Sequence, residues 1–208
     1  MRLPRLYVIC DRKAAVAGCG NALDAAQAAA DAGARFFQIR DRDLAPDDLW
    51  RYAENLTLRL AGYSPTLMMN ERADIALALG LAGVHRPQVG LPVAPLRRLM
   101  EGHRLIGVSC HDEAEAEDSA ALGADFVTLS PVFGTPSKPR AKPLGTAAFR
   151  RIAERVDIPV FALGGIAPGH VGDCLDCGAY GVAVLSGIMS AEDPYDATRR
   201  YLAALGEN

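Results

Sequence analysis

Residues 160–188, VFALGGIAPGHVGDCLDCGAYGVAVLSGI, decide which fold the chain adopts. Two short apolar runs in this stretch, 160–163 and 181–185, are typical of strands that are buried on both faces. Between them, residues 168–177 predict a short helix that ends before Gly178. A strand, a glycine-rich turn, a helix and a second strand with its own turn are typical of the last two units of a (β/α)8 barrel, whose loops bind phosphate.

The turns that follow these two strands carry the phosphate-binding prediction. They read Gly164-Gly165 and Ser186-Gly187. Only a residue without a Cβ lets backbone N–H groups approach phosphate oxygens closely at a helix N-terminus. One such pair would indicate no more than a tight turn. Two pairs, one repeat apart and each directly after a buried strand, favour a phosphate site.

The rest of the chain repeats the same alternation of strand and helix. Buried-strand patterns lie at residues 6–10, 35–40, 66–70, 83–86, 105–110, 126–130, 160–163 and 181–185. Because these runs are continuously apolar, they predict a parallel sheet with both faces covered. Eight units, joined by right-handed crossovers and without a dinucleotide-binding fingerprint, favour a closed barrel over a doubly wound sheet. The sequence therefore predicts a single-domain α/β (β/α)8 barrel over residues 1–208.

Charge and cysteine content exclude several classes of protein. The chain has 208 residues and a formal net charge of -3, with no basic face for nucleic acid. No apolar run reaches membrane-spanning length and the N-terminus lacks signal-peptide features, so a cytoplasmic location is expected, with a homo-oligomer left open. Five irregularly spaced cysteines indicate structural thiols, Cys174 and Cys177 included, rather than disulfides or a zinc site.

Polar residues gather where the predicted strands run into the following helices, which is where barrel enzymes place their active sites. They are Asp11, Gln38, Arg40, Arg42, Asn70, Glu71, Arg72, His85, Gln88, Ser109, His111, Ser130 and Lys138. Cations and amides predominate, so the expected ligand is anionic, most simply a phosphate or pyrophosphate ester. In the long loop of residues 131–145, Thr135, Ser137 and Lys138 predict a segment that closes over a second phosphate group.

Several of these residues also have purely structural explanations. Taken alone, His85 is more typical of a core histidine than of a catalytic one. Asn70 is also typical of a helix cap and Asp11 of an ion-pair partner. His111 is suited to acid or base chemistry near neutral pH, but it could also cap the next helix.

Seven motifs in order along the chain resemble those of the thiamin phosphate synthase and TenI family. They are LYVICD, FQIRDRD, NERADIALALGLAGVH, IGVSCH, SPVFGTPSKP, LGGIAPGHV and GVAVLSGI. The resemblance spans almost the whole chain and implies a barrel of thiamin biosynthesis. It implies that a pyrimidine diphosphate contacts Gln38, Arg40, Asn70, Ser137 and Lys138, with Ser109 beside the pyrimidine. It also implies that Thr135 and the two glycine turns hold a thiazole phosphate.

Four departures from the family's pattern bear on the reaction. Arg42 stands where the family has a lysine, and Glu71 stands for its first magnesium-binding aspartate. Gly90 falls on or beside the second aspartate, so one expected carboxylate is missing. The segment HRPQ resembles TenI, a metal-independent thiazole tautomerase, whose catalytic histidine corresponds here to Pro131.

The first hypothesis is therefore a TenI-type barrel that binds a thiazole phosphate through its glycine turns and acts as a tautomerase without a cofactor. His111 or His85 would be its acid-base group, with Ser109 nearby. The alternative is a thiamin phosphate synthase that joins hydroxymethylpyrimidine diphosphate to hydroxyethylthiazole phosphate and uses magnesium, with Glu71 as the metal's protein ligand. A third is a non-catalytic protein that binds thiazole phosphate or thiamin phosphate.

Overall fold

Eight parallel strands close into a barrel in the computed structural model, which describes residues 2–16, 20–100, 104–135 and 140–207. Each strand pairs with the next along the chain, and the last pairs with the first. The strands are β1 (Leu6–Asp11), β2 (Phe36–Arg40), β3 (Thr66–Asn70), β4 (Gly83–Arg86), β5 (Leu105–Cys110), β6 (Phe126–Leu129), β7 (Val160–Leu163) and β8 (Gly181–Val184). The predicted (β/α)8 barrel is confirmed.

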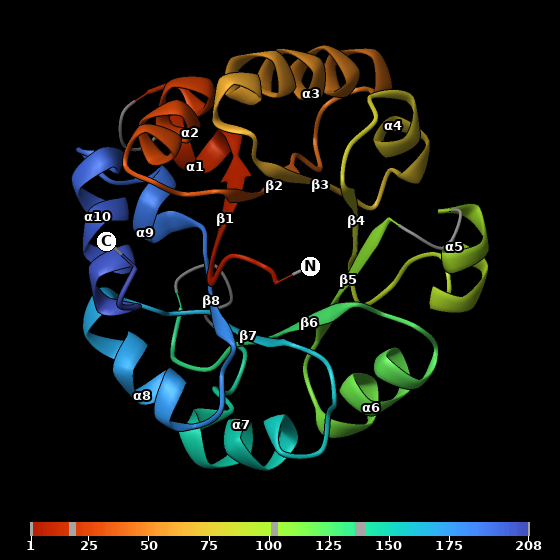
Figure 1. Cartoon of the computed structure of the whole chain (residues 1–208), viewed down its shortest axis with the longest axis vertical. Coiled ribbons are helices and arrows are strands. Elements are labelled where there is room, and N and C mark those ends of the chain that lie inside the picture. Colours follow the sequence, from red (N-terminus) through yellow and green to blue (C-terminus); the bar gives the residue numbers. More distant parts are fainter. Residues whose placement is uncertain (1, 17–19, 101–103, 136–139, 208) are drawn as a thin grey trace.

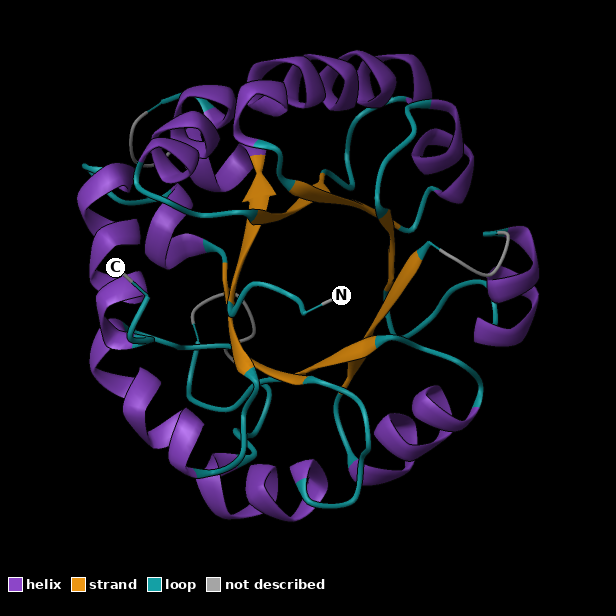
Figure 2. Cartoon of the chain, in the orientation of Figure 1, coloured by secondary structure: helices purple, strands orange, loops and turns teal. Residues whose placement is uncertain are grey.

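Helices surround the strands as an outer layer (Figures 1 and 2). They are α1 (Arg12–Val16), α2 (Ala22–Asp31), α3 (Pro46–Leu60), η1 (Ala61–Tyr63), α4 (Ala73–Ala78), α5 (Val93–Leu99), α6 (Glu113–Ala121), α7 (Gly145–Ala153), η2 (Pro168–His170), α8 (Val171–Asp176), α9 (Ser186–Met189) and α10 (Pro194–Ala204). The short helices α1 and α9 were not predicted, because they have too few residues to show a helical period.

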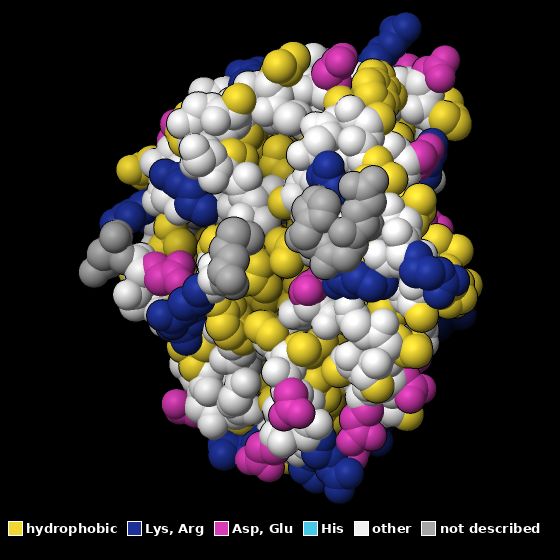
Figure 3. Space-filling model, turned by 45° about the vertical axis from the view of Figure 1, so that its right-hand side comes forward, with side chains coloured by type: hydrophobic (Ala, Val, Ile, Leu, Met, Phe, Trp, Pro, Cys, Tyr) yellow, Lys and Arg dark blue, Asp and Glu magenta, His cyan; other side chains and the backbone are white. Residues whose placement is uncertain are grey.

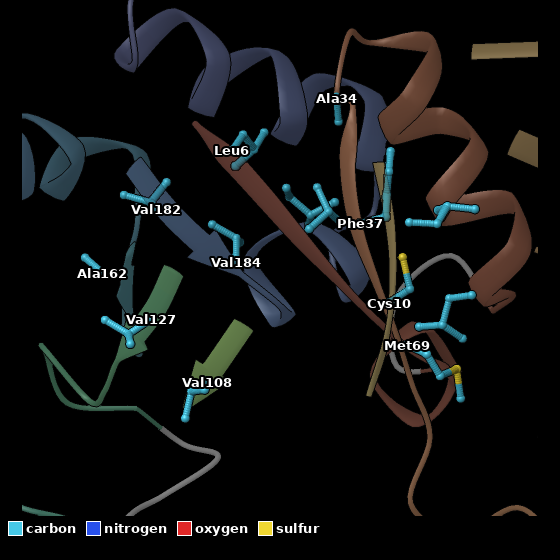
Figure 4. Packing of buried hydrophobic residues seen from close by; sticks show 14 of the residues in the cluster. Leu6, Cys10, Ala34, Phe37, Met69, Val108, Val127, Ala162, Val182 and Val184 are labelled. Atoms are coloured by element: carbon cyan, nitrogen blue, oxygen red, sulfur yellow. The ribbon is translucent and has the colours of Figure 1, made fainter. Parts of the chain in front are cut away.

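Alternate residues of the strands build two separate hydrophobic layers. Inside the barrel, the rings of Tyr7, Phe36, Phe126 and Phe161 pack together, and Tyr7 stacks on Phe36 with 4.0 Å between ring centroids. The opposite faces of the strands pack against the helices; Figure 4 shows Leu6 and other residues of this layer. Burial of each large side chain contributes about 1.5–3 kcal/mol. The aromatic layer fills the interior of the barrel, and the open cavity lies at the carboxyl ends of the strands.

Within the described ranges, the cysteines are buried free thiols. Burial raises the pKa of Cys174 to about 11, so it stays protonated at neutral pH. These observations support the predicted structural role of Cys174 and Cys177. Figure 3 shows basic and acidic side chains interspersed over one face of the molecule. None of the helices in the described residues is long and apolar enough to cross a membrane.

Candidate functional site

A cavity of about 1040 Å³ opens at the carboxyl ends of the strands. The predicted site residues that line it are Asp11, Gln38, Arg40, Arg42, Asn70, Glu71, Arg72, His85, Gln88, Ser109, His111, Ser130, Thr135, Gly164, Gly165, Ser186 and Gly187. The parallel barrel brings them together because all its strands end at the same rim. Ser137 and Lys138, also predicted to bind phosphate, lie outside the described residues.

The first glycine turn requires glycine for both its backbone conformation and its packing. Gly164 and Gly165 follow β7 with φ values of +96° and +68°. A Cβ on Gly164 would lie 2.8 Å from Pro131, and one on Gly165 would lie 2.4 Å from the carbonyl oxygen of Gly134. Neither backbone N–H donates a hydrogen bond to any described residue. Both groups therefore remain available for an anion.

The second turn, at the start of α9, is equally restricted. A Cβ on Gly187 would lie 2.2 Å from the hydroxyl oxygen of Tyr201, which itself donates a hydrogen bond to the carbonyl oxygen of Ile166. In the described part of the chain, the N–H of Gly187 donates no hydrogen bond. The two turns thus present backbone donors to the same cavity, as a phosphate cradle requires.

His170, which sequence reasoning missed, supports the first turn. Its Nδ1 lies 3.0 Å from the carbonyl oxygen of Gly165 and 3.2 Å from the backbone nitrogen of Ala167. Its ring stacks on Phe133 with 4.4 Å between centroids. The His170 imidazole therefore holds this turn in place. It lies in η2 rather than at the end of a strand, so the pattern of polar residues at strand ends does not include it.

Arginine side chains form the other anion-binding wall, at the end of β2. Arg40 is half-buried and makes an ion pair with Asp11. Burial and then the neighbouring Arg42 lower the pKa of Arg40, while Asp11 raises it, and an arginine remains charged in either case. The other carboxylate oxygen of Asp11 accepts the backbone N–H groups of Lys13 and Ala14. Asp11 therefore both begins α1 and holds Arg40 at the cavity.

A buried hydrogen-bond network lies beneath the cavity and includes His85. The imidazole is 2% exposed, with Nδ1 3.4 Å from the Tyr7 hydroxyl and Nε2 2.9 Å from the Ser109 hydroxyl. The Gln38 amide donates to Tyr7 over 2.9 Å. Burial first, and then the charge of Arg40, lower the pKa of His85 to about 3. His85 is therefore neutral at physiological pH, as a core histidine is, while also touching the cavity.

This buried histidine is expected to make the protein sensitive to acid. The unfolded chain takes up a proton on His85 below about pH 6.5, whereas the folded chain does so only near pH 3. Stability is consequently lost as the pH falls through this window, by about 3 kcal/mol between pH 7.5 and pH 4.5. Urea unfolding of the wild type and of His85→Gln should show this difference in pH dependence. Parallel pH curves for the two proteins would contradict it.

His111 and Glu115 form a second titratable pair at the cavity. His111 Nδ1 lies 3.4 Å from Glu115 Oε2, and the same oxygen accepts the His111 backbone N–H over 2.7 Å. The cap of α6 is Asp112, which accepts the Glu115 N–H, so His111 does not cap this helix as one alternative had it. An imidazole held against a carboxylate is suited to proton transfer.

Neither polar residue at the end of β3 caps the following helix. Asn70 is buried and lines the cavity, while α4 begins at Ala73 with Arg72 at its N-cap and no side-chain cap. Glu71 is exposed and has a φ of +65°, in the left-handed region that disfavours residues with a Cβ. No hydrogen bond or ion pair among the described residues involves its carboxylate, because the neighbouring Arg72 pairs with Asp74 instead. Such strain at a cavity wall is typical of functional positions.

Whether the cavity can hold magnesium depends on which of its carboxylates are available as ligands. The described residues include no group of three or more His, Cys, Asp and Glu side chains placed to hold a metal. Asp11 and Asp41 are each engaged by an arginine, which leaves Glu71 with an unpaired carboxylate. Magnesium is commonly held by one or two carboxylates, substrate phosphates and water. The donor set therefore fits an ion shared between Glu71 and a bound diphosphate.

Comparison with known proteins extends the resemblance found in the sequence. A putative thiamine-phosphate synthase from Geobacter sulfurreducens is 40% identical over 201 residues, which cover 96% of this chain and 93% of that protein. A thiamine-phosphate synthase from Roseiflexus castenholzii is 38% identical over 195 residues, with 93% and 85% covered. The solved thiamine phosphate pyrophosphorylase from Pyrococcus furiosus superposes with a TM-score of 0.87 at 28% identity, covering 97% of this chain and 95% of that one.

The family match covers both walls of the cavity. It runs over residues 6–188, from β1 to the glycine turn after β8. More distant barrels, such as 3-hexulose-6-phosphate synthase at 18% identity and a TM-score of 0.74, share the fold alone. With relatives near 40% identity along most of its length, the chain belongs to the thiamine monophosphate synthase (TMP-TENI) family.

Proposed function

We propose that this protein is a thiamin phosphate synthase, which joins hydroxymethylpyrimidine diphosphate to hydroxyethylthiazole phosphate and releases pyrophosphate. The sequence alone placed this activity second, after a TenI-type tautomerase. The order changes because the relatives named above are described as synthases and because the cavity has room and donors for two phosphorylated ligands.

The observation that carries the proposal is the presence of two anion-binding walls. Arg40 and Arg42 follow β2, whereas the glycine turns follow β7 and β8. Around the eight-stranded ring, β2 lies three strands from β7 and two from β8, so the arginines and the glycine turns form separate parts of the rim. A tautomerase acting on a thiazole carboxylate phosphate needs one phosphate-binding wall and a single cation for the carboxylate, whereas a pair of arginines suits a diphosphate. A synthase needs one for the diphosphate and one for the thiazole phosphate.

The proposed reaction requires charge neutralisation more than acid-base catalysis. The bond between the pyrimidine methylene carbon and the diphosphate oxygen breaks, and the thiazole nitrogen forms a new bond to that carbon. Pyrophosphate leaves with the electron pair, and no proton moves. Arg40 and Arg42 would stabilise the departing charge, while the N–H groups of Gly164 and Gly165 would fix the thiazole phosphate. When bound through Glu71, magnesium supplies further positive charge to the leaving group.

The test is formation of thiamin phosphate from the two substrates with saturating magnesium. We expect turnover by the wild type and its loss in Glu71→Ala. The matched control is Glu54→Ala, an exposed carboxylate on α3 that does not line the cavity. Absence of product with folded wild-type protein would overturn the proposal.

One observation favours the tautomerase as a second candidate. The His111–Glu115 pair places a carboxylate-supported imidazole at the cavity, although Pro131 itself carries no titratable group. If the protein isomerises a thiazole carboxylate phosphate, His111→Asn should abolish that activity. An unchanged rate would exclude His111 as the acid or base. Binding of a thiazole phosphate without either reaction would favour a non-catalytic protein.

A further inference from the structure

A continuous chain of hydrogen bonds runs from inside the barrel to the cavity wall. It joins Gln38 to Tyr7, Tyr7 to His85 and His85 to Ser109, over 2.9, 3.4 and 2.9 Å. Tyr7 is fully buried, Gln38 and His85 are 2% exposed, and Ser109 is half-buried at the cavity. The first three residues therefore hold their bonds out of reach of solvent, and Ser109 is the member with room to turn towards a ligand.

The direction of each bond follows from the chemistry of its groups. Gln38 donates through its amide nitrogen, so the Tyr7 oxygen is the acceptor. Because Tyr7 is fully buried, its O–H also needs an acceptor, and the remaining partner among the described residues is His85 Nδ1. A neutral imidazole that accepts at Nδ1 carries its proton on Nε2. Nε2–H in turn donates to the Ser109 oxygen at 2.9 Å, which is nearer than the Thr128 hydroxyl at 3.5 Å, and this leaves the Ser109 O–H to point elsewhere.

The surrounding residues fix the imidazole in this orientation. A Cβ on Gly107, in β5, would lie 2.6 Å from His85 Nδ1, so a glycine there makes room for the ring. The ring also packs near Tyr7 and Phe126, with centroids 5.8 and 5.7 Å away. Because the ring is enclosed on these sides, rotation would break its polar contacts with Tyr7, Ser109 and Thr128. These contacts therefore allow the His85 ring a single orientation.

We propose that His85, oriented by Tyr7, is a positioning residue that makes Ser109 a hydrogen-bond donor towards the substrate. A donor at this place recognises an unprotonated ring nitrogen or a carbonyl oxygen and disfavours a protonated ring. The ligand class is therefore a neutral heterocycle with an acceptor atom on its edge. The assignment of that heterocycle to the pyrimidine diphosphate rests on the proposed function, whereas the bond directions in the ligand-free protein do not.

Imidazole ¹⁵N NMR of the ligand-free protein tests the bond directions by themselves. The spectrum of His85→Gln identifies the signals of His85. We expect the Nε2–H tautomer, unchanged between pH 8 and pH 5. The Nδ1–H tautomer would overturn the proposal, because Nε2 would then accept from Ser109 and the serine would face the ligand as an acceptor. This result is independent of whether the protein is a synthase.

Paired variants test the consequence for the substrate. Glutamine at position 85 can place an amide nitrogen near the position of Nε2, whereas asparagine reaches only as far as Nδ1. We expect His85→Asn to raise the KM for the pyrimidine diphosphate about tenfold, with the KM for the thiazole phosphate unchanged, and His85→Gln to stay within about threefold. Tyr7→Phe should give an intermediate loss. Equal losses for both substrates in both His85 variants would indicate a merely structural role and overturn the proposal.

Discussion

Gly165→Ala is expected to lower kcat/KM for the thiazole phosphate by about 100-fold or more in a barrel that still folds. Alanine at a φ of +68° costs about 1–2 kcal/mol in the backbone alone. Its Cβ would also lie 2.4 Å from the Gly134 oxygen and 2.9 Å from the Phe133 Cβ. The turn must therefore shift, and its N–H groups lose their alignment with the phosphate.

The Gly165 turn has little freedom to absorb such a shift. The Phe133 N–H donates to the Gly164 oxygen over 3.0 Å, and His170 contacts the Gly165 oxygen from the other side. Hydrogen bonds to a charged group contribute about 1.5–3 kcal/mol each. Losing two of them costs about 3 kcal/mol or more, which corresponds to a reduction of about 100-fold or more at 1.36 kcal/mol for each factor of ten.

Gly169→Ala is the matched control for this prediction. Gly169 lies in η2, four residues further on, and a Cβ there would meet no atom within 4 Å. We expect wild-type kinetics from the control. The measurements are the KM for each substrate, the direct affinity for the thiazole phosphate and the thermal unfolding of both variants. A wild-type KM in folded Gly165→Ala would show that the turn does not hold the thiazole phosphate.

The sequence predicted the eight strands because continuous apolar runs carry a clear signal. Helix boundaries were less accurate: α5 begins at Val93, two residues before the Pro95 start that was expected, since proline is tolerated anywhere in the first turn. The helix expected over residues 168–177 is divided into η2 and α8. Such details depend on packing against neighbouring elements, which local patterns do not encode.

The rim of the site was also predictable, because strand ends converge in a barrel whatever the side chains are. What the sequence could not predict are pairings between distant elements. Tyr7 lies one residue into β1 and looks like an ordinary core aromatic, yet it bonds Gln38 and His85. His170 behind the glycine turn has no signal of its own. The tautomerase was placed first because the sequence lacks one of the family's two magnesium-binding carboxylates. A count of carboxylates cannot show that the Glu71 side chain makes no ion pair with the described residues.

Glu71→Asn is the second variant expected to have a large effect, with a loss of about 100-fold in magnesium-dependent synthesis of thiamin phosphate. The substitution removes the one cavity carboxylate that the described residues leave unpaired. Losing a charged metal ligand is expected to cost several kcal/mol of transition-state stabilisation. Glu71→Asp is the matched control because it keeps the carboxylate, one methylene shorter. It should stay within about threefold of the wild type at saturating magnesium.

Stability should move in the opposite direction to activity at this position. Asparagine and aspartate tolerate a φ near +65° better than glutamate does. Both variants are therefore expected to unfold at equal or higher urea concentration, with a gain of up to about 1 kcal/mol. A loss of activity without a loss of stability then separates metal binding from folding. The test of magnesium binding is the rate of synthesis measured against magnesium concentration. A wild-type magnesium dependence in Glu71→Asn would mean that other groups hold the ion. The backbone strain at Glu71 would then need a different explanation.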